Sequence, residues 1–194
     1  PQPVQPDRTP GKVQVEPVIT KATEVNFEAG DQIGFTMTKV NGTEAYADNA
    51  ALTFDGTVFS GDLKWYADAY SEADVYAYYP YNANGTPAAY AAVLDQTAGI
   101  AQADFMAAAK KGVLPTPNAI TMVFKHLMTK IVVNIDNQSG ADVTAVKILG
   151  GDAACEIDLP NLAVLPASGA MSTELTEITA YEATAGKVWK AIVI

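Results

Sequence analysis

The chain has 194 residues, 49% of them hydrophobic, which is enough for one large or two small domains with a real core. Its 12 Lys and Arg residues are outnumbered by 22 Asp and Glu residues, and this net charge of -10 argues against binding to nucleic acid or an anionic membrane surface. With one arginine (Arg8), one histidine (His126) and one cysteine (Cys155), the chain has no arginine set for phosphate recognition, no internal disulfide and no zinc cluster.

The first twelve residues, 1–12, are rich in proline and predict an extended spacer of the kind that follows a processed anchor. An ordinary disordered terminus is the alternative. No run reaches the roughly 18 to 20 apolar residues that a membrane-spanning helix needs, and no charged-then-apolar leader opens the chain. The protein is therefore either cytosolic or exported with its leader removed, and the proline-rich start favours export.

From Val13 onward the composition predicts an all-β fold, because runs of Val, Ile, Thr, Tyr and Phe alternate with Gly, Asn, Asp and Pro. We expect strands at Val13–Lys21, Gln32–Val40, Ala51–Phe54, Val58–Ser60, Val75–Tyr79, Ala91–Leu94, Ile120–Phe124, Lys130–Ile135, Val143–Leu149, Glu156–Leu159, Leu175–Glu182 and Lys187–Ile194. Many short strands separated by frequent turns indicate a β-sandwich. The exception is Ile100–Lys111, whose Ala, Met and Lys content predicts one helical turn or an irregular loop.

A domain boundary is predicted from the alternation of side chains around His126. The large apolar residues before it lie at even positions (Ile120, Met122, Phe124), and those after it lie mainly at odd positions (Leu127, Ile131, Val133, Ile135). Successive strand residues face opposite sides, so the chain changes from one core to another here, unless a β-bulge produces the same switch. We expect domains at 13–126 and 127–194, with His126 packed or hydrogen-bonded at the junction.

The second predicted domain contains few residues, and the chain stops inside the apolar run VWKAIVI. We therefore expect this β-domain to be incomplete. An open domain would expose core side chains and unpaired backbone groups, which is a template for a strand from another molecule.

Several stretches resemble, in order and spacing, the fimbrillin-like family of Bacteroidales, the major and minor subunits of type V pili. They include F-x-x-G-D-x-I-G at 27–34, the tyrosine-rich Y-Y-P-Y at 78–81 and F-K-H-L-M-T-K-I at 124–131. The resemblance covers residues 25–135. It implies two transthyretin-like or Ig-like β-sandwich domains in tandem and a lipoprotein precursor exported to the outer membrane and cell surface.

The resemblance also implies a structural subunit, stalk or tip, that polymerises with other fimbrial subunits by β-strand donation and supports adhesion to a host or bacterial surface ligand. The apolar residues expected to form the polymerisation groove are Leu127, Ile131, Val133, Ile135, Ile192 and Ile194. Arg8 is the candidate site of protease maturation, although it precedes the first predicted strand, so cleavage there would remove only the spacer. The resemblance implies that the protein is attached to the membrane only through a lipid anchor on the precursor.

The alternative function is that of a monomeric surface lipoprotein that binds glycans through a Tyr- and Trp-rich face. Trp65, Tyr76 and Tyr78 are its candidate contacts, with Val75, Ala77 and Tyr79 facing the core. Catalysis is not expected, because no G-x-S-x-G elbow accompanies the single histidine and the paired acids fit solvated strand faces. We expect no cofactor and no metal, and we interpret Cys155 as a small buried apolar residue.

Overall fold

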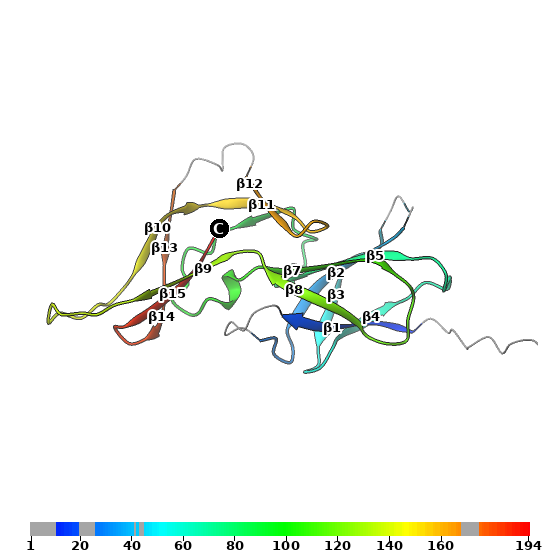
Figure 1. The fold of residues 1–194 in the computed structure, drawn as a ribbon, viewed down its shortest axis with the longest axis horizontal. Helices are drawn as coiled ribbons and strands as arrows, with labels where there is room; N and C mark the ends of the chain where they lie inside the picture. Colours follow the sequence, from blue (N-terminus) through cyan, green and yellow to red (C-terminus); the bar gives the residue numbers. More distant parts are fainter. Residues whose placement is uncertain (1–10, 20–25, 41, 43–44, 168–174) are drawn as a thin grey trace, which may run out of the picture. The chain divides into compact units, whose positions relative to one another are not determined.

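The computed structural model describes residues 11–19, 26–40, 42, 45–167 and 175–194 (Figure 1). The strands are β1 Lys12–Ile19, β2 Gln32–Lys39, β3 Ala45–Phe54, β4 Phe59–Lys64, β5 Ala73–Tyr79, β6 Ala89–Ala91, β7 Met106–Val113, β8 Ile120–His126, β9 Thr129–Asn134, β10 Lys147–Asp152, β11 Ala154–Asp158, β12 Ala163–Pro166, β13 Leu175–Thr179, β14 Tyr181–Thr184 and β15 Val188–Val193. The 3₁₀ helix η1, Ala101–Ala103, is the helix in these ranges. The all-β prediction is confirmed. Within the described residues, no helix has the length and apolar character needed to cross a membrane.

The chain divides into two compact units. The first contains residues up to Thr86 together with Ala108–Lys125, and the second contains Pro87–Ala107 together with His126–Ile194. The chain therefore passes from one unit to the other three times, whereas the predicted domains are continuous in sequence. The predicted domain boundaries at 126 and 127 remain a prediction.

In the first unit, seven strands form one sheet whose two ends meet. The order is β1-β4-β3-β2-β5-β7-β8, and β1 closes the ring. This strand pairs antiparallel with β4 and parallel with β8. Because both edges of β1 are used, none of the described strands of this sheet is left as an unpaired edge that could template another chain.

Alternate side chains of these strands point into one core. In β8, Ile120, Met122 and Phe124 are buried and the residues between them are exposed, as the sequence predicted. Phe27 joins this core through edge-on contacts, with its ring centroid 4.9 Å from that of Phe59 and 5.3 Å from that of Phe124. Such tilted and perpendicular ring pairs are the favoured aromatic geometries.

Tyr78 ties β2, β3 and the turn after β5 together. Its hydroxyl donates to Asn49 Oδ1 at 2.7 Å and accepts a hydrogen bond from the Asn82 backbone N–H at 3.1 Å. Asn49 also donates through Nδ2 to the carbonyl of Asn82 at 2.8 Å. The Tyr78 ring lies over Gly34, its cross-strand partner, where a Cβ would come within 2.1 Å of Tyr78 Cε1. Gly34 is therefore required to leave room for the ring.

The second unit consists of three small sheets, with orders β10-β13, β12-β11-β6 and β14-β15-β9 (Figure 1). Its β10-β13 and β14-β15-β9 sheets share a core cluster of Ile178, Ala180, Trp189 and Ala191, all buried. Seven further hydrophobic residues pack against this cluster but are only partly buried: Ala92, Val133, Ile135, Val143, Val146, Ile148 and Val193. This core is less enclosed than that of the first unit.

The prediction for Ile100–Lys111 is only partly right, because η1 supplies the helical turn but Met106–Val113 is strand β7. Met106, Ala107 and Ala108 are fully buried in that strand. Sheet packing therefore overrides the helical propensity of alanine. Other differences are smaller: β12 was not predicted, Leu175–Glu182 is divided into β13 and β14, and β10 begins at Lys147 and not at Val143.

We expect Gly34→Ala to lower the free energy of unfolding by about 2 kcal/mol, because the added methyl group overpacks a site already filled by the Tyr78 ring. Urea denaturation measures the change. The control is Gly11→Ala, whose Cβ would lie an ordinary 3.7 Å from the nearest atom, Pro117 Cα. Equal stability of the two variants would contradict the packing role of Gly34.

Candidate functional site

The residues predicted to form a polymerisation groove gather on β9 and β15, which pair antiparallel from Thr129↔Val193 to Asn134↔Val188. Directly opposite residues of an antiparallel pair share a face of the sheet. Ile131 lies opposite Ala191, and Val133 lies opposite the buried Trp189, so these side chains face the core cluster. Ile135 packs on the same cluster.

The other predicted groove residues do not lie on this face. Ile192 is opposite Lys130, on the other side of the sheet, where its side chain is 5% exposed. Ile194 follows β15 at the same parity and is half-buried, as is Leu127, which precedes β9. The structure therefore brings three of the six residues, Ile131, Val133 and Ile135, onto one surface.

One edge of β9 is free of strand pairing within the described residues, since β9 is the last strand of its sheet. The Ile135 N–H donates to the carbonyl of Lys187, on the β15 side, at 2.8 Å. Because backbone groups alternate in direction along an antiparallel strand, those of Lys130, Val132 and Asn134 point away from β15. They form the open edge of β9, beside the partly buried side of the core cluster, and Val132 is 45% exposed.

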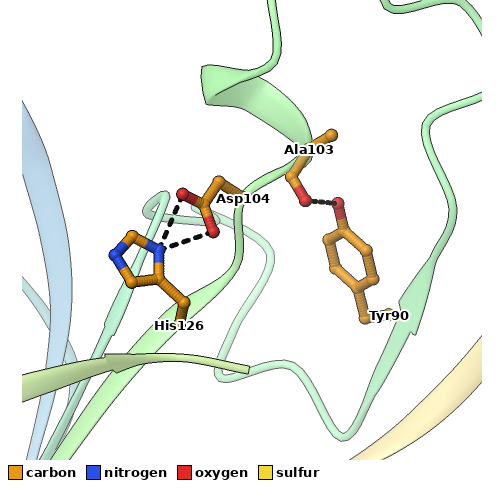
Figure 2. Close-up of polar contacts among 4 residues, drawn as sticks. All are labelled: Tyr90, Ala103, Asp104 and His126. Atoms are coloured by element: carbon orange, nitrogen blue, oxygen red, sulfur yellow. Dashed lines mark hydrogen bonds and ion pairs between the residues drawn. The ribbon is translucent and has the colours of Figure 1, made fainter. Parts of the chain in front are cut away.

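A second polar feature lies at the end of β8, where His126 Nδ1 is 2.9 Å from Oδ1 and 2.8 Å from Oδ2 of Asp104 (Figure 2). A carboxylate only accepts hydrogen bonds, so the imidazole donates through Nδ1. Asp104 is buried and His126 is mostly buried. Next to this pair, the Leu127 N–H donates to the carbonyl of Phe105 at 2.9 Å. The hydrogen-bonded role predicted for His126 is confirmed.

Tyr90 of β6 lies beside this pair. Its hydroxyl donates to the carbonyl of Ala103 at 2.9 Å (Figure 2). The centroid of its ring lies 5.4 Å from that of Phe105. Burial of the phenol, with the nearby Asp104 carboxylate as a smaller cause, raises the pKa of Tyr90 to about 12. Tyr90 also pairs through β6 with Cys155, which is buried, and burial raises the pKa of that thiol. Tyr90, Asp104, His126 and Cys155 therefore form a closely packed cluster of buried and partly buried polar side chains.

Residues 20–194 match the fimbrillin-like family. The chain belongs to this family. The resemblance drawn from the ordered motifs is confirmed. Fimbrillin-like proteins are structural, and membership implies exposure at the cell surface and assembly with other fimbrial subunits.

Solved structures share the fold of this fimbrillin-like chain. A candidate cell adhesion protein from Bacteroides ovatus has a TM-score of 0.70 at 22% identity, over 96% of this chain and 78% of that one. Another, from Bacteroides uniformis, has a TM-score of 0.67 at 24% identity, over 95% and 74% of the two chains. A fimbrial protein from Bacteroides ovatus has a TM-score of 0.57 at 17% identity, over 96% and 42%. A comparison with curated proteins gives no match.

The aromatic residues proposed as glycan contacts do not form an exposed face in this fimbrillin-like protein. Trp65 and Tyr78 are 2% and 1% exposed, and Tyr76 is half-buried. Tyr78 is therefore not exposed, contrary to the prediction, because its ring lies over Gly34 and its hydroxyl bonds to Asn49 and to the turn after β5. Val75, Ala77 and Tyr79 are buried as predicted.

Two further predictions concern Arg8 and metal ligands. Arg8 lies outside the described residues. Within the described ranges, no group of three or more His, Cys, Asp and Glu residues is arranged to hold a metal ion. Asp104 and Gln96 were not predicted as important residues, and each is buried with hydrogen-bonded partners. Neither belongs to a recognisable motif: Gln96 lies in a stretch with the composition of a turn, and Asp104 lies in the alanine-rich segment Ile100–Lys111.

We expect His126→Ala to lower the free energy of unfolding by about 2 kcal/mol, less than the loss for a fully enclosed charge pair because the ring keeps some exposure. Its cause is the buried Asp104 carboxylate left without its donor. Lys125→Ala, one position earlier and exposed, is the control and should change stability by less than about 0.5 kcal/mol. Chemical denaturation compares the two, and equal losses would contradict this role.

The raised pKa of Tyr90 predicts a loss of stability at high pH. The pKa of the phenol is 10.0 in the unfolded chain and about 12 in the folded one, so between these pH values unfolding releases a proton. Its contribution is fully present below pH 10 and falls as pH rises toward 12. Unfolding free energies measured across this window should fall more steeply for the wild type than for Tyr90→Phe. Parallel curves would contradict the assignment.

Proposed function

We propose that this protein is a structural subunit of a cell-surface fimbrium and that it polymerises by accepting a β-strand from another subunit at the open edge of β9. Membership in the fimbrillin-like family supports the fimbrial role. The fold shared with a fimbrial protein of Bacteroides ovatus supports it as well. The free edge of β9 beside an incompletely enclosed core carries the assembly mechanism.

The backbone of β9 supplies directional contacts for an added strand. Lys130, Val132 and Asn134 each direct an N–H and a C=O outward, so a strand laid along this edge would pair in register with three residues. Main-chain pairing of this kind provides affinity that does not depend on the side chains of the added strand.

The side chains of the added strand provide the selectivity. Its alternate residues would face the core cluster next to Ile131, Val133 and Ile135, and an apolar residue there contributes up to about 1.5 to 3 kcal/mol on full burial. The residues between them would face solvent. The donor segment is therefore expected to alternate apolar and polar residues over at least five positions.

This proposal narrows the predicted groove to Ile131, Val133 and Ile135. Leu127 flanks this set, whereas Ile192 and Ile194 have the parity of the opposite face of the sheet. The proposal also includes delivery to the outer membrane as a lipid-anchored precursor, maturation near Arg8, and adhesion through the finished polymer. Family membership supports these later steps, since it implies a surface-exposed assembly.

We expect Val132→Pro to abolish polymerisation while the subunit stays folded. Proline removes the Val132 N–H, which points to the open edge, and Val132 is a tolerated position because proline is accepted on edge strands. Electron microscopy of surface material from cells expressing the full-length precursor measures the fibres, and circular dichroism of the purified subunit checks folding.

The matched control is Val132→Thr, which retains the N–H and the branched Cβ and changes only an exposed side chain. It should form fibres at the wild-type level. Wild-type numbers of fibres from folded Val132→Pro would show that no strand pairs with this edge of β9.

A further inference from the structure

Gln96 is a buried side chain whose hydrogen-bonding groups all bind backbone. Its Nε2 donates to the carbonyl of Ile192 at 2.7 Å and to that of Val93 at 2.9 Å. Its Oε1 accepts from the Ile192 N–H at 2.8 Å. The side chain is 1% exposed. One carboxamide thus satisfies both backbone groups of Ile192.

These hydrogen bonds lie where β15 extends beyond its pairing with β14. On one edge β15 pairs with β9 along its whole length, but on the other its pairing with β14 ends at Lys190↔Tyr181. Ile192 lies opposite Lys130 of β9 at a position where both residues point their backbone groups away from each other. Its N–H and C=O would be an open edge, and the Gln96 carboxamide takes the place of a peptide group from a further strand.

The backbone of the same residue is attached to β13. The Gln96 N–H donates to the carbonyl of Thr179 at 3.0 Å, and the Thr179 N–H donates to the carbonyl of Leu94 at 2.8 Å, forming a parallel bridge at Asp95. Gln96 therefore joins the β10-β13 sheet, through its backbone, to the β14-β15-β9 sheet, through its side chain. This side of the core is closed by hydrogen bonds.

We infer that Gln96 determines where this sheet accepts a strand: it closes the part of β15 at Ile192 that extends beyond β14, and so directs an incoming strand of another subunit to β9. The inference rests on the proposed function, since it selects between two edges for the same event. Only a carboxamide of this length fits the role. Leucine has no polar group, glutamate has no donor for the two carbonyls, and asparagine is one methylene shorter.

Amide hydrogen exchange of the wild-type protein, as subunit and as polymer, tests the inference. In the subunit the Val132 N–H should exchange rapidly and the Ile192 N–H slowly, because among the described residues only the second has a hydrogen-bond partner. On polymerisation we expect exchange at Val132 to slow by at least about 100-fold and exchange at Ile192 to change by less than about threefold. A slowing at Ile192 as large as at Val132 would place a strand on β15 and overturn the inference.

This comparison also separates the two levels of the argument. If polymers form and Val132 stays unprotected, strand addition at β9 is wrong and the inference falls with it. If Val132 becomes protected but Ile192 does too, strand addition stands and only the role of Gln96 is overturned. The wild-type measurement needs no variant, so a folding defect cannot obscure it.

Gln96→Leu provides the second test, with Gln102→Leu as the control, because Gln102 is exposed in the neighbouring helix η1. In the Gln96→Leu subunit, Ile192 should exchange about 100-fold faster, and in its polymer it should become protected, as the opened edge takes a strand. Gln102→Leu should match the wild type at both amides. An Ile192 amide that stays fast in the Gln96→Leu polymer would overturn the directing role.

Discussion

Every β-strand presents a row of backbone N–H and C=O groups on each edge, and these groups must find partners wherever water is excluded. The two units of this chain meet that requirement in different ways. In the first, β1 pairs with β4 on one side and β8 on the other, so the sheet closes on itself. In the second, the three small sheets stay open, and β9 is one of their end strands within the described residues. The position of the candidate assembly site follows from this difference.

Buried polar side chains supply hydrogen bonds where strand pairing stops. Tyr78 and Asn49 hold the turn after β5, His126 holds Asp104 beside η1, and Gln96 replaces a missing strand next to Ile192. Each of these contacts joins segments far apart in the sequence. A buried group left without its partner costs more than the hydrogen bond gains, so such contacts fix one arrangement of the loops between strands.

The sequence is sufficient to predict the strand-rich fold, most strand positions and the change of buried parity after Phe124, because alternation of apolar residues reports directly on which face is covered. It does not predict β7, whose alanine-rich segment reads as helix and becomes a strand only through burial between neighbours. The roles of Gln96 and Asp104 cannot be predicted from the sequence for a related reason. Their partners, Ile192 and His126, are identified only when the chain is folded, and neither residue stands in a pattern that indicates a buried hydrogen bond.

The six residues predicted for the groove illustrate the same limit at the site. Parity within one strand correctly places Ile131, Val133 and Ile135 on one face, but it cannot relate that face to β15, because the register between two strands is set by pairing. The register shows that the Ile192 side chain lies on the opposite face of the sheet. The backbone N–H and C=O of Ile192 are hydrogen-bonded to the Gln96 side chain. This register directs the backbone groups of Lys130 and Ile192 to opposite sides of the β9-β15 pair. On the β15 side the Gln96 side chain binds them, whereas on the β9 side no strand of the described residues pairs with them, so the register and Gln96 together leave β9 as the open edge.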